Sequence, residues 1–577
     1  MTALSLFQTL PMSIVDKVVE YLEGRSRNFL DPNLMKYIES KKVLLPLLCV
    51  SQHWRAAALS LVCNSCEVEF DYTTKGFEAT YPALPEDFPF SQYRGQNLVK
   101  RVLVCAPNMN EIYGGDFSST PSQPKPDFPI FPLATKLVVF QVKNNMSPPI
   151  PGYGGFPACC DEPVDRNKVT VEYARTLRRL APAATDIILS FDSLGSTDKK
   201  NRGLYNVLVT ELFSGAIVHL HVESRTGPPL PSFKLNAITQ LTCIRQGANM
   251  ACTPFAQLAY ENTRTLQELS IRLKAEADWH TLIYGGKSTS AVYSSLTSLA
   301  IKIVGIPCGT FCAAIEDAAP FPALRKLDVS SPYTFDDDLF FRGNGKTLQN
   351  LNIPYGAVDK NIFGRFGVLE RNGVTQMNSI AIGVGDDEDY TLVAEHGDAH
   401  IVQQVQRMAN VARTLSVGYD TADALVYKSI LATSRAAIIQ HFEYRCQPLD
   451  TANILDIISF LPCLVSLTCR VKGSVPNIEA ISASEYPMAI FAKNYHRRIS
   501  FRKLVILGEY ADYDDRDEMA RAIAVIAVHI IVPCFNFRHV DLASDLRTTF
   551  SREIAWAVVN PPFMQYAASL RRLVYRF

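Results

Sequence analysis

The sequence lacks any apolar stretch long enough to cross a membrane. Its longest apolar run, residues 522–535, is interrupted by His529 and Pro533 and is shorter than the roughly 20 residues that a membrane-spanning helix needs. Residues 1–13 also lack the basic region and the long apolar core of a secretion signal. We therefore expect neither a transmembrane helix nor a membrane partner.

The sequence also lacks an excess of charge of either sign. It has 57 Lys and Arg residues against 57 Asp and Glu residues, so its formal net charge at pH 7 is zero. Binding to nucleic acid or to an anionic membrane relies on cations that neutralise phosphate, so this balance predicts no nucleic-acid partner. A local basic patch is still compatible with a balanced total. Hydrophobic residues at 47% and charged residues at 20% are typical of folded protein and argue against disorder.

Cysteine is sparse, and the 14 cysteines are scattered along the 577 residues. Disulfide-stabilised secreted domains carry cysteine far more densely, so this usage favours a reducing compartment, the cytoplasm or the nucleus. Cys63 and Cys66 have the spacing of half a zinc site, but no matching pair follows. We therefore expect buried thiols and no metal cofactor.

Signatures of catalysis are missing as well. The segment Gly285-Gly286-Lys287 is similar to part of a phosphate-binding loop, but the glycine required four residues earlier is Thr281. The sequence has no nucleophile elbow and no zinc-protease motif. His219 and His221 flank Leu220 and are expected to be exposed on a strand. These absences predict a protein that is not an enzyme and needs no cofactor, with an enzyme of dispersed catalytic residues as a weaker alternative.

The N-terminal part of the chain has the apolar spacing of short helices. Ile14, Val15 and Val18 follow Leu10-Pro11 at helical intervals, and Pro11 is tolerated in the first turn of a helix. After residues 23–42, a second apolar stretch leads to Ser51 as an N-cap and to Trp54. Periodicity alone is equally compatible with a small helical cap over the edge of the following domain.

The order of these residues resembles the F-box, a three-helix module. The resemblance covers residues 5–65, and the insertion at 23–42 departs from the family pattern. It implies binding to a Skp1-type adaptor, which links F-box proteins to a cullin-based ubiquitin ligase. The residues that it implies at the adaptor interface are Leu10, Pro11, Ile14, Val15, Val18, Leu45, Leu48, Val50 and Trp54.

An internal repeat runs through the rest of the chain. Its pattern, apolar-x-x-apolar-x-apolar, recurs from Val99/Val102/Val104 to Leu570/Leu573/Tyr575, and from residue 266 onward successive units begin 24 to 37 residues apart. Helix-period segments separate many of the units. The helical segments that we predict are 310–319, 399–413, 422–437, 454–461, 487–498, 518–532 and 552–559.

A strand followed by a helix in each repeat resembles the leucine-rich repeat. This resemblance predicts an α/β solenoid over residues 66–577, with parallel strands on the concave face, helices on the convex face and a loop-rich, proline-rich part at 81–163. The sequence departs from the regular family pattern because it has no asparagine or cysteine ladder after the strands. A doubly wound α/β domain is the alternative, because it also alternates strands and helices.

An F-box-like module before a leucine-rich solenoid resembles the divergent, fungal-type substrate receptors of cullin ubiquitin ligases. This resemblance implies a non-catalytic adaptor that recruits an unknown protein target, and the alternative is a repeat scaffold without a ubiquitin link. Strand alternation predicts which side chains face the target. These are Glu268, Ser270, Ser298, Lys326, Asp328, Asn350, Asn352, Ser466, Thr468, Arg470, Lys503, His539, Asp541 and Arg572.

Acidic clusters at 336–338, 386–389 and 512–518 follow strand patterns, so we expect them in loops at one rim of the solenoid. They are interpreted as solvated loop tips. A rim that selects a basic partner is the alternative.

Overall fold

The computed structural model spans the whole chain, and the following description covers the residues that it places well. The described residues are 59, 65–71, 76–80, 97–106, 129–141, 166–191, 207, 210–213, 217–224, 235, 237–245, 253–273, 276–287, 290–303, 319–330, 343–344, 346–353, 374, 376–382, 406–418, 438–471, 500–507, 516–531, 537–542, 546–560 and 563–576. The F-box-like module predicted at 5–65 lies outside them, except for residues 59 and 65. All nine adaptor-binding candidates also lie outside, so the module stays a prediction.

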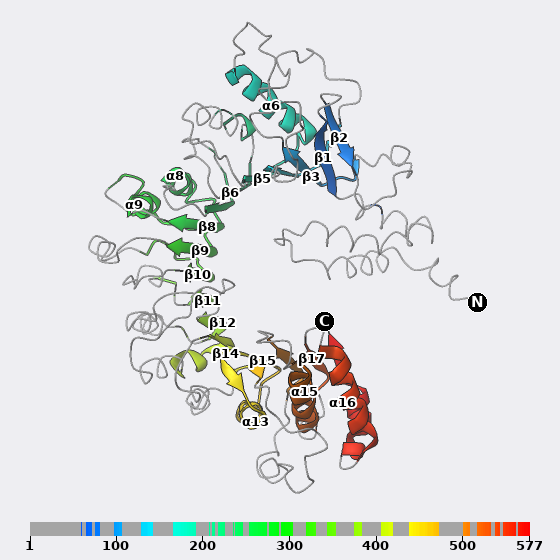
Figure 1. The fold of residues 1–577 in the computed structure, drawn as a ribbon. Helices are drawn as coiled ribbons and strands as arrows, with labels where there is room; N and C mark the ends of the chain where they lie inside the picture. The colour runs from blue at the N-terminus through cyan, green and yellow to red at the C-terminus, as the bar shows by residue number, and fades with distance from the viewer. Residues whose placement is uncertain are drawn as a thin grey trace, which may run out of the picture. The chain divides into compact units, whose positions relative to one another are not determined.

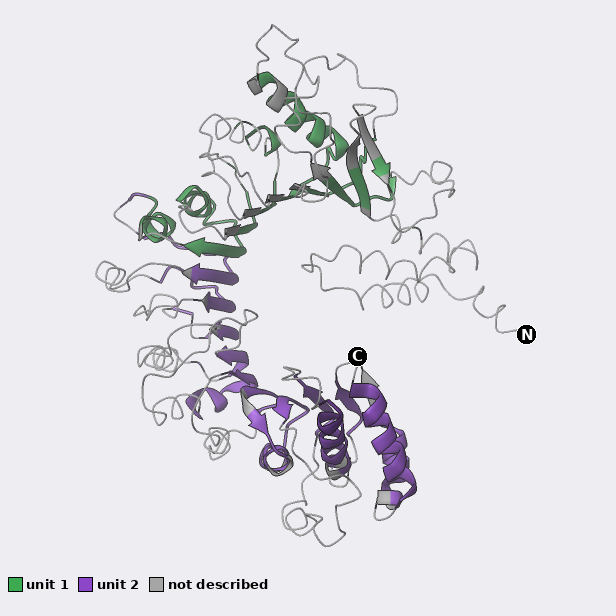
Figure 2. Cartoon of the chain, in the orientation of Figure 1, with its two compact units in different colours: residues 1–285 green, residues 286–577 purple. Residues whose placement is uncertain are grey.

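The chain divides into two compact units, Met1–Gly285 and Gly286–Phe577 (Figure 2). In unit 1 the strands are β1 (Ser65–Asp71), β2 (Gly76–Thr80), β3 (Arg101–Ala106), β4 (Lys136–Gln141), β5 (Asp186–Phe191), β6 (His219–Ser224), β7 (Gln240–Arg245) and β8 (Glu268–Leu273). Its helices are α6 (Arg166–Leu180), α8 (Thr253–Glu261) and α9 (Glu276–Tyr284). Helices α8 and α9 pack against each other and on the same side of β8 (Figure 1).

Unit 2 continues the alternation of strands and helices. Its strands are β9 (Ser298–Ile303), β10 (Lys326–Ser330), β11 (Asn350–Ile353), β12 (Met377–Ile382), β13 (Ala412–Val417), β14 (His441–Leu449), β15 (Ser466–Val471), β16 (Lys503–Ile506), β17 (His539–Asp541) and β18 (Val574–Arg576). Its helices are α13 (Thr451–Phe460), α15 (Arg516–Ile531), α16 (Arg547–Val559), the 3-10 helix η10 (Phe563–Tyr566) and α17 (Ala567–Arg571). Helix α15 packs between α13 and α16.

Within each unit, every strand from β3 onward pairs in parallel with the next strand along the chain. A doubly wound sheet would reverse its strand order at a switch point, and neither unit does so. The pairing therefore confirms stacked α/β repeats of solenoid type. The hairpin of β1 and β2 is antiparallel, and the sequence pattern did not predict it.

The three apolar positions of the repeat form the core. In the repeat of β15, Leu464 lies in the turn before the strand and Leu467 and Cys469 lie within it, and all three are fully buried at 0% exposure. Each buried leucine contributes about 1.5–3 kcal/mol relative to an exposed one. The predicted triplets match the observed strands from β3 to β17. At β18 the predicted triplet is out of register with the preceding strand. Tyr575 is the third position of its own triplet, but it pairs with Val540, which is the second position of the triplet of β17.

A recurring backbone contact fixes the register between repeats. The carbonyl oxygen of the residue before one strand accepts two N–H groups from the start of the next strand. Val465 O accepts from Arg502 N at 2.8 Å and Lys503 N at 3.1 Å, and Thr185 O accepts from Val218 N at 3.0 Å and His219 N at 3.3 Å. Because this contact occurs in both units, side chains at equivalent positions stand in rows across the strands.

The helix predictions are confirmed in part. The segments predicted at 454–461, 518–532 and 552–559 coincide with α13, α15 and α16, although α16 begins five residues earlier. The segment predicted at 399–413 is wrong at its end, because Ala412 and Arg413 already belong to β13. Helices α6, α8 and α9 were not predicted. The segments 422–437 and 487–498 lie outside the described residues, as does all but the last residue of 310–319.

The glycines that resembled a phosphate loop end a helix instead. Gly285 and Gly286 follow α9 with φ angles of 55° and 78°, a left-handed conformation that glycine adopts at helix ends. A Cβ on Gly285 would lie 2.2 Å from the Tyr260 ring, so the site also excludes larger residues. Among the described helices, none has the length and apolar character needed to span a membrane.

Candidate binding surface on the strand face

The predicted target-facing residues fall on the side of the strands that faces away from the buried triplets. We call the positions of this kind in β10 to β17 the polar strand face. It contains Lys326, Asp328, Asn350, Asn352, Ser466, Thr468, Arg470, Lys503, His539 and Asp541. It also contains Ser379, Ser416, His441, Glu443 and Arg445 of β12 to β14, which were not predicted from the sequence. Glu268 and Ser270 lie on β8 of unit 1, and Ser298 lies on β9. Arg572 is exposed but lies in the turn before β18, outside the strand.

The first part of the polar strand face is joined by hydrogen bonds between neighbouring strands. The Asn352 amide donates from Nδ2 to Asp328 Oδ2 at 3.0 Å, and the Ser379 hydroxyl donates to Asn350 Oδ1 at 2.8 Å. Both pairs are in register across the strands. Burial raises the pKa of the Asp328 carboxyl, while the bond from Asn352 and the charge of Lys326 oppose that rise.

In the central part of the polar strand face, Glu443 of β14 contacts two other polar side chains. Its carboxylate accepts from Ser416 Oγ at 2.8 Å and from Arg445 Nε at 2.7 Å. His441 Nδ1 and Ser466 Oγ share a hydrogen bond of 2.7 Å on the next pair of strands. Sequence reasoning missed Glu443, Arg445 and His441, although their alternation with the buried Phe442 and Tyr444 would have found them.

The last part of the face has an ion pair between Lys503 of β16 and Asp541 of β17. Their side chains are 40% and 25% exposed, so the pair contributes only about 0–1 kcal/mol to stability. His539 stands beside Lys503 in the strand register. The ion pair holds the two side chains in place without removing them from a partner's reach.

These contacts determine which interactions the polar strand face can make with a partner. Its side chains are donors and acceptors of moderate exposure that neighbouring strands hold in fixed positions, so binding a partner costs little side-chain entropy. No group of three or more candidate metal ligands occurs among the described residues. Burial raises the pKa of the Cys469 thiol to about 12, so that cysteine serves the core and is not a nucleophile.

The corresponding face of unit 1 has a less polar row. Leu103, Val138, Ile188 and His221 align across β3 to β6. His221 points away from the core as predicted, but its exposure is only 8%, so the expectation of an exposed histidine is wrong for it. Its apolar neighbours desolvate the ring, and burial, with the nearby His219 and Lys136, lowers the pKa of His221 to about 4.

His219 lies at the start of the same strand, with Nδ1 at 4.0 Å from Asp186 Oδ1. Burial lowers the pKa of His219, while the carboxylate of Asp186 opposes that shift. The two histidines therefore sit in different surroundings, because only His221 lies in the apolar row.

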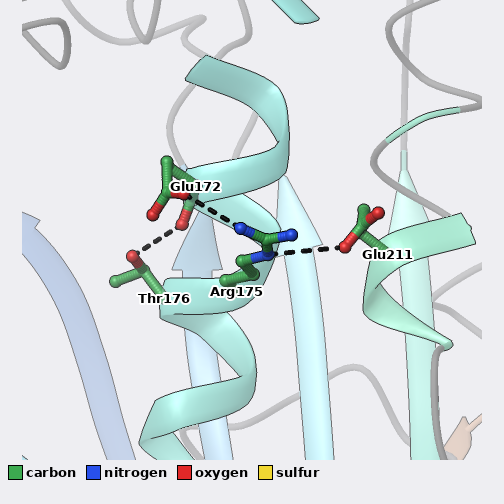
Figure 3. Close-up of polar contacts among 4 residues, drawn as sticks. All are labelled: Glu172, Arg175, Thr176 and Glu211. Carbon is green, nitrogen blue, oxygen red and sulfur yellow. Dashed lines mark hydrogen bonds and ion pairs between the residues drawn. The ribbon is translucent and has the colours of Figure 1, made fainter. Parts of the chain in front are cut away.

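The helix side of unit 1 has its own polar contacts (Figure 3). Arg175 of α6 contacts Glu172 Oε1 at 3.2 Å and Glu211 Oε2 at 3.6 Å. The Thr176 hydroxyl donates to the backbone oxygen of Glu172 at 2.7 Å. Because two carboxylates balance the charge of Arg175 on the exposed side of α6, we assign this arginine to holding α6 beside the segment of Glu211.

Sequence reasoning missed two buried asparagines in the turns before the strands, of which Asn262 bonds to its turn through the side chain. Asn262 donates from Nδ2 to Leu235 O at 2.8 Å and to Leu258 O at 2.9 Å, and its Oδ1 accepts from Ile238 N at 3.1 Å. Asn344 is also buried, and the N–H groups of Thr347 and Leu348 both donate to its backbone carbonyl oxygen. The signal was present in the sequence, because both segments read Asn-x-x-Thr-Leu-Gln-x-Leu.

Comparison with family models and curated proteins gives no match for this chain, whereas comparison with solved structures gives matches. A solved structure described as the TLR13–ssRNA13 complex aligns with 72% of this chain at 10% identity and a TM-score of 0.26. The alignment spans 58% of that protein, which is somewhat more than half of its length. The fold described here rests on the strand pairing within this chain.

Proposed function

We propose that this protein is a non-catalytic binding scaffold that captures a protein target on its polar strand face. The observation that supports this proposal is the set of polar contacts between neighbouring strands from Asp328 to Asp541, which presents fixed donors and acceptors across successive strands. A repeat solenoid typically uses such an extended surface for binding.

The finer part of the proposal is that the target is delivered to a Skp1-type adaptor and a cullin ubiquitin ligase. It rests on the resemblance of residues 5–65 to the F-box. The mechanism would be positional, because holding a target beside the ubiquitin-loaded enzyme raises the effective concentration of its lysines. The protein itself would contribute no reacting group.

A pull-down with the purified adaptor tests this link. We expect wild-type protein to retain the adaptor and the variant Leu10→Asp/Pro11→Ala to lose it. The matched control is Leu34→Asp, which places the same charge in the insertion. If wild type and the Leu10→Asp/Pro11→Ala variant recover the adaptor equally, or neither recovers it, the ligase proposal is wrong and a scaffold without a ubiquitin link remains.

A further inference from the structure

The arginines that precede the strands of unit 2 form a row at one edge of its sheet. Arg325, Arg502 and Arg538 each stand immediately before a strand, and Arg413 occupies the equivalent position at the start of β13. In the strand register, Lys326 pairs with Asn350 and Asn350 pairs with Ser379, and the pairing continues in the same way to His539. Each of the four arginines stands one residue before one of these paired residues, so the four arginines form one row across the sheet. All four side chains are exposed.

Further cations surround this row, and acidic residues are absent from it. The described residues that lead into the strands of unit 2 are 290–297, 319–325, 343–344, 346–349, 374, 376–378, 406–413, 438–440, 461–465, 500–502, 537–538 and 563–573, and none of these residues is Asp or Glu. They contain eight cations, which we call the basic edge: Arg325, Lys346, Arg407, Arg413, Arg502, Arg538, Arg571 and Arg572. No carboxylate in the described part of the chain pairs with any of them.

The backbone holds the basic edge in position. Arg325 N donates to Thr297 O at 2.9 Å, Arg502 N donates to Val465 O at 2.8 Å, and Arg538 N donates to Arg502 O at 3.0 Å. Arg502 and Arg538 precede neighbouring parallel strands, which lie roughly 5 Å apart, and this is less than the Debye length of about 8 Å at physiological salt, so their potentials add. Arg325 and Arg413 each lie three strands from the next arginine of the row, roughly 14 Å away, so they extend the basic edge along the sheet without such coupling. A chain with no net charge thus has a locally positive surface.

Compensation within the fold does not account for this concentration of charge. Helices α13 and α15 end shortly before β15 and β17, and each helix end supplies about half an elementary negative charge. Two such ends offset roughly one of the eight cations. The last turn of α13 has no basic residue, whereas Arg571 lies in the last turn of α17, so one cation of the basic edge belongs to a helix end.

We propose that the basic edge of unit 2 binds an acidic polypeptide segment of a partner protein. Arginine presents a planar fork that matches a carboxylate with two hydrogen bonds, and all four cations of the row are arginine. Between them, Gln349, Asn378 and Gln440 add amide donors at the same edge. A single-stranded nucleic acid would need aromatic side chains on which bases stack, and no aromatic residue occupies a position of this row.

Fluorescence anisotropy with a labelled twelve-residue oligoglutamate peptide tests this assignment on the full chain. We expect wild type to bind, with affinity that falls as salt rises, and Arg502→Glu/Arg538→Glu to bind about tenfold more weakly or less. The variant Arg502→Lys/Arg538→Lys preserves the charge and is expected to lose no more than about threefold. The matched control Arg179→Glu/Arg552→Glu changes the net charge equally at exposed helix positions and is expected to bind like wild type.

Circular dichroism melting of each variant separates binding from folding, and Arg325→Glu/Arg413→Glu repeats the test at other strands. The proposal is overturned if the peptide does not bind, if the control loses as much affinity as the edge variant, or if a single-stranded oligouridylate of equal length binds more tightly through the same arginines. The basic edge lies outside the F-box-like segment, so this result is independent of the adaptor pull-down.

Discussion

At the scale of single residues, the surroundings of a side chain decide its chemistry more than its place in the strand alternation. His219 and His221 lie on the same face of β6, yet only His221 stands in the apolar row with Leu103, Val138 and Ile188. The alternation was visible in the sequence. The apolar row was not, because its members are 33 to 50 residues apart along the chain and meet only through strand pairing.

The pH dependence of stability should report this burial. Because the pKa of His221 falls to about 4 in the folded protein, the unfolded chain binds a proton that the folded chain does not bind between about pH 6.5 and 4. The stability contributed by neutral His221 is therefore complete above this window and lost as pH falls through it, by on the order of 3 kcal/mol. Urea unfolding of wild type and His221→Gln across this window measures the effect.

We expect His221→Gln to flatten the slope of unfolding free energy against pH, because glutamine does not titrate. His280→Gln on the exposed side of α9 serves as the control and should keep the wild-type slope. Parallel slopes for wild type and His221→Gln would show that this histidine does not contribute the pH dependence.

At the scale of elements, a buried side chain in the turn before a strand can connect one repeat to the previous one. Asn262 links the end of α8, through Leu258 O, to the preceding turn through Leu235 O and Ile238 N. It therefore ties one repeat to the previous one with a single buried side chain. The regular leucine-rich pattern places its asparagine after the strand, whereas this chain places Asn262 and Asn344 six residues before the strands β8 and β11.

Removing this link should destabilise unit 1 measurably. Asn262→Ala leaves the carbonyl group of Leu235 and the N–H group of Ile238 without their partner, at a cost of about 1–3 kcal/mol for each group left unsatisfied, whereas Leu258 O keeps its bond from the backbone N–H of residue 262. Thermal unfolding monitored by circular dichroism should show a lower midpoint. Asn378→Ala removes an exposed amide and should change the midpoint little. Equal midpoints for Asn262→Ala and wild type would contradict the bonding described for this residue.

Helices were predicted less well than strands, for a physical reason. A strand triplet repeats the same three buried positions, whereas a helix needs only one apolar stripe that its neighbours cover. α6 illustrates this, because its single apolar stripe lies among charged residues such as Glu172, Arg175 and Arg178. Its buried residues, which include Tyr173, Ala174 and Leu177, stand at helical spacing, so this helix was present in the sequence pattern although it was not predicted.

At the scale of the whole molecule, stability in stacked repeats is local. Each repeat contacts mainly its neighbours, so a defect should spread only across adjacent strands. Leu467→Ala in β15 creates a cavity in a fully buried site and should cost about 2–5 kcal/mol. Hydrogen exchange should then accelerate in β14 to β16 and stay unchanged in β4 to β6.

The control for this experiment is Thr468→Ala at the adjoining outward position, which removes no core atoms and should leave exchange close to that of wild type. Uniform acceleration across both units in Leu467→Ala would indicate a single cooperative structure instead of stacked repeats.

The sequence by itself determined the core positions of the strands from β3 to β17, because apolar side chains at positions one, four and six can be buried only by stacked neighbours. It also indicated the outward positions, because side chains alternate along a strand. The tertiary structure alone decided which of those positions meet. Asp328 and Asn352, Ser416 and Glu443, and Lys503 and Asp541 are joined across loops of unequal length. The basic edge arises in the same way, because parallel pairing gathers arginines from distant repeats into one row.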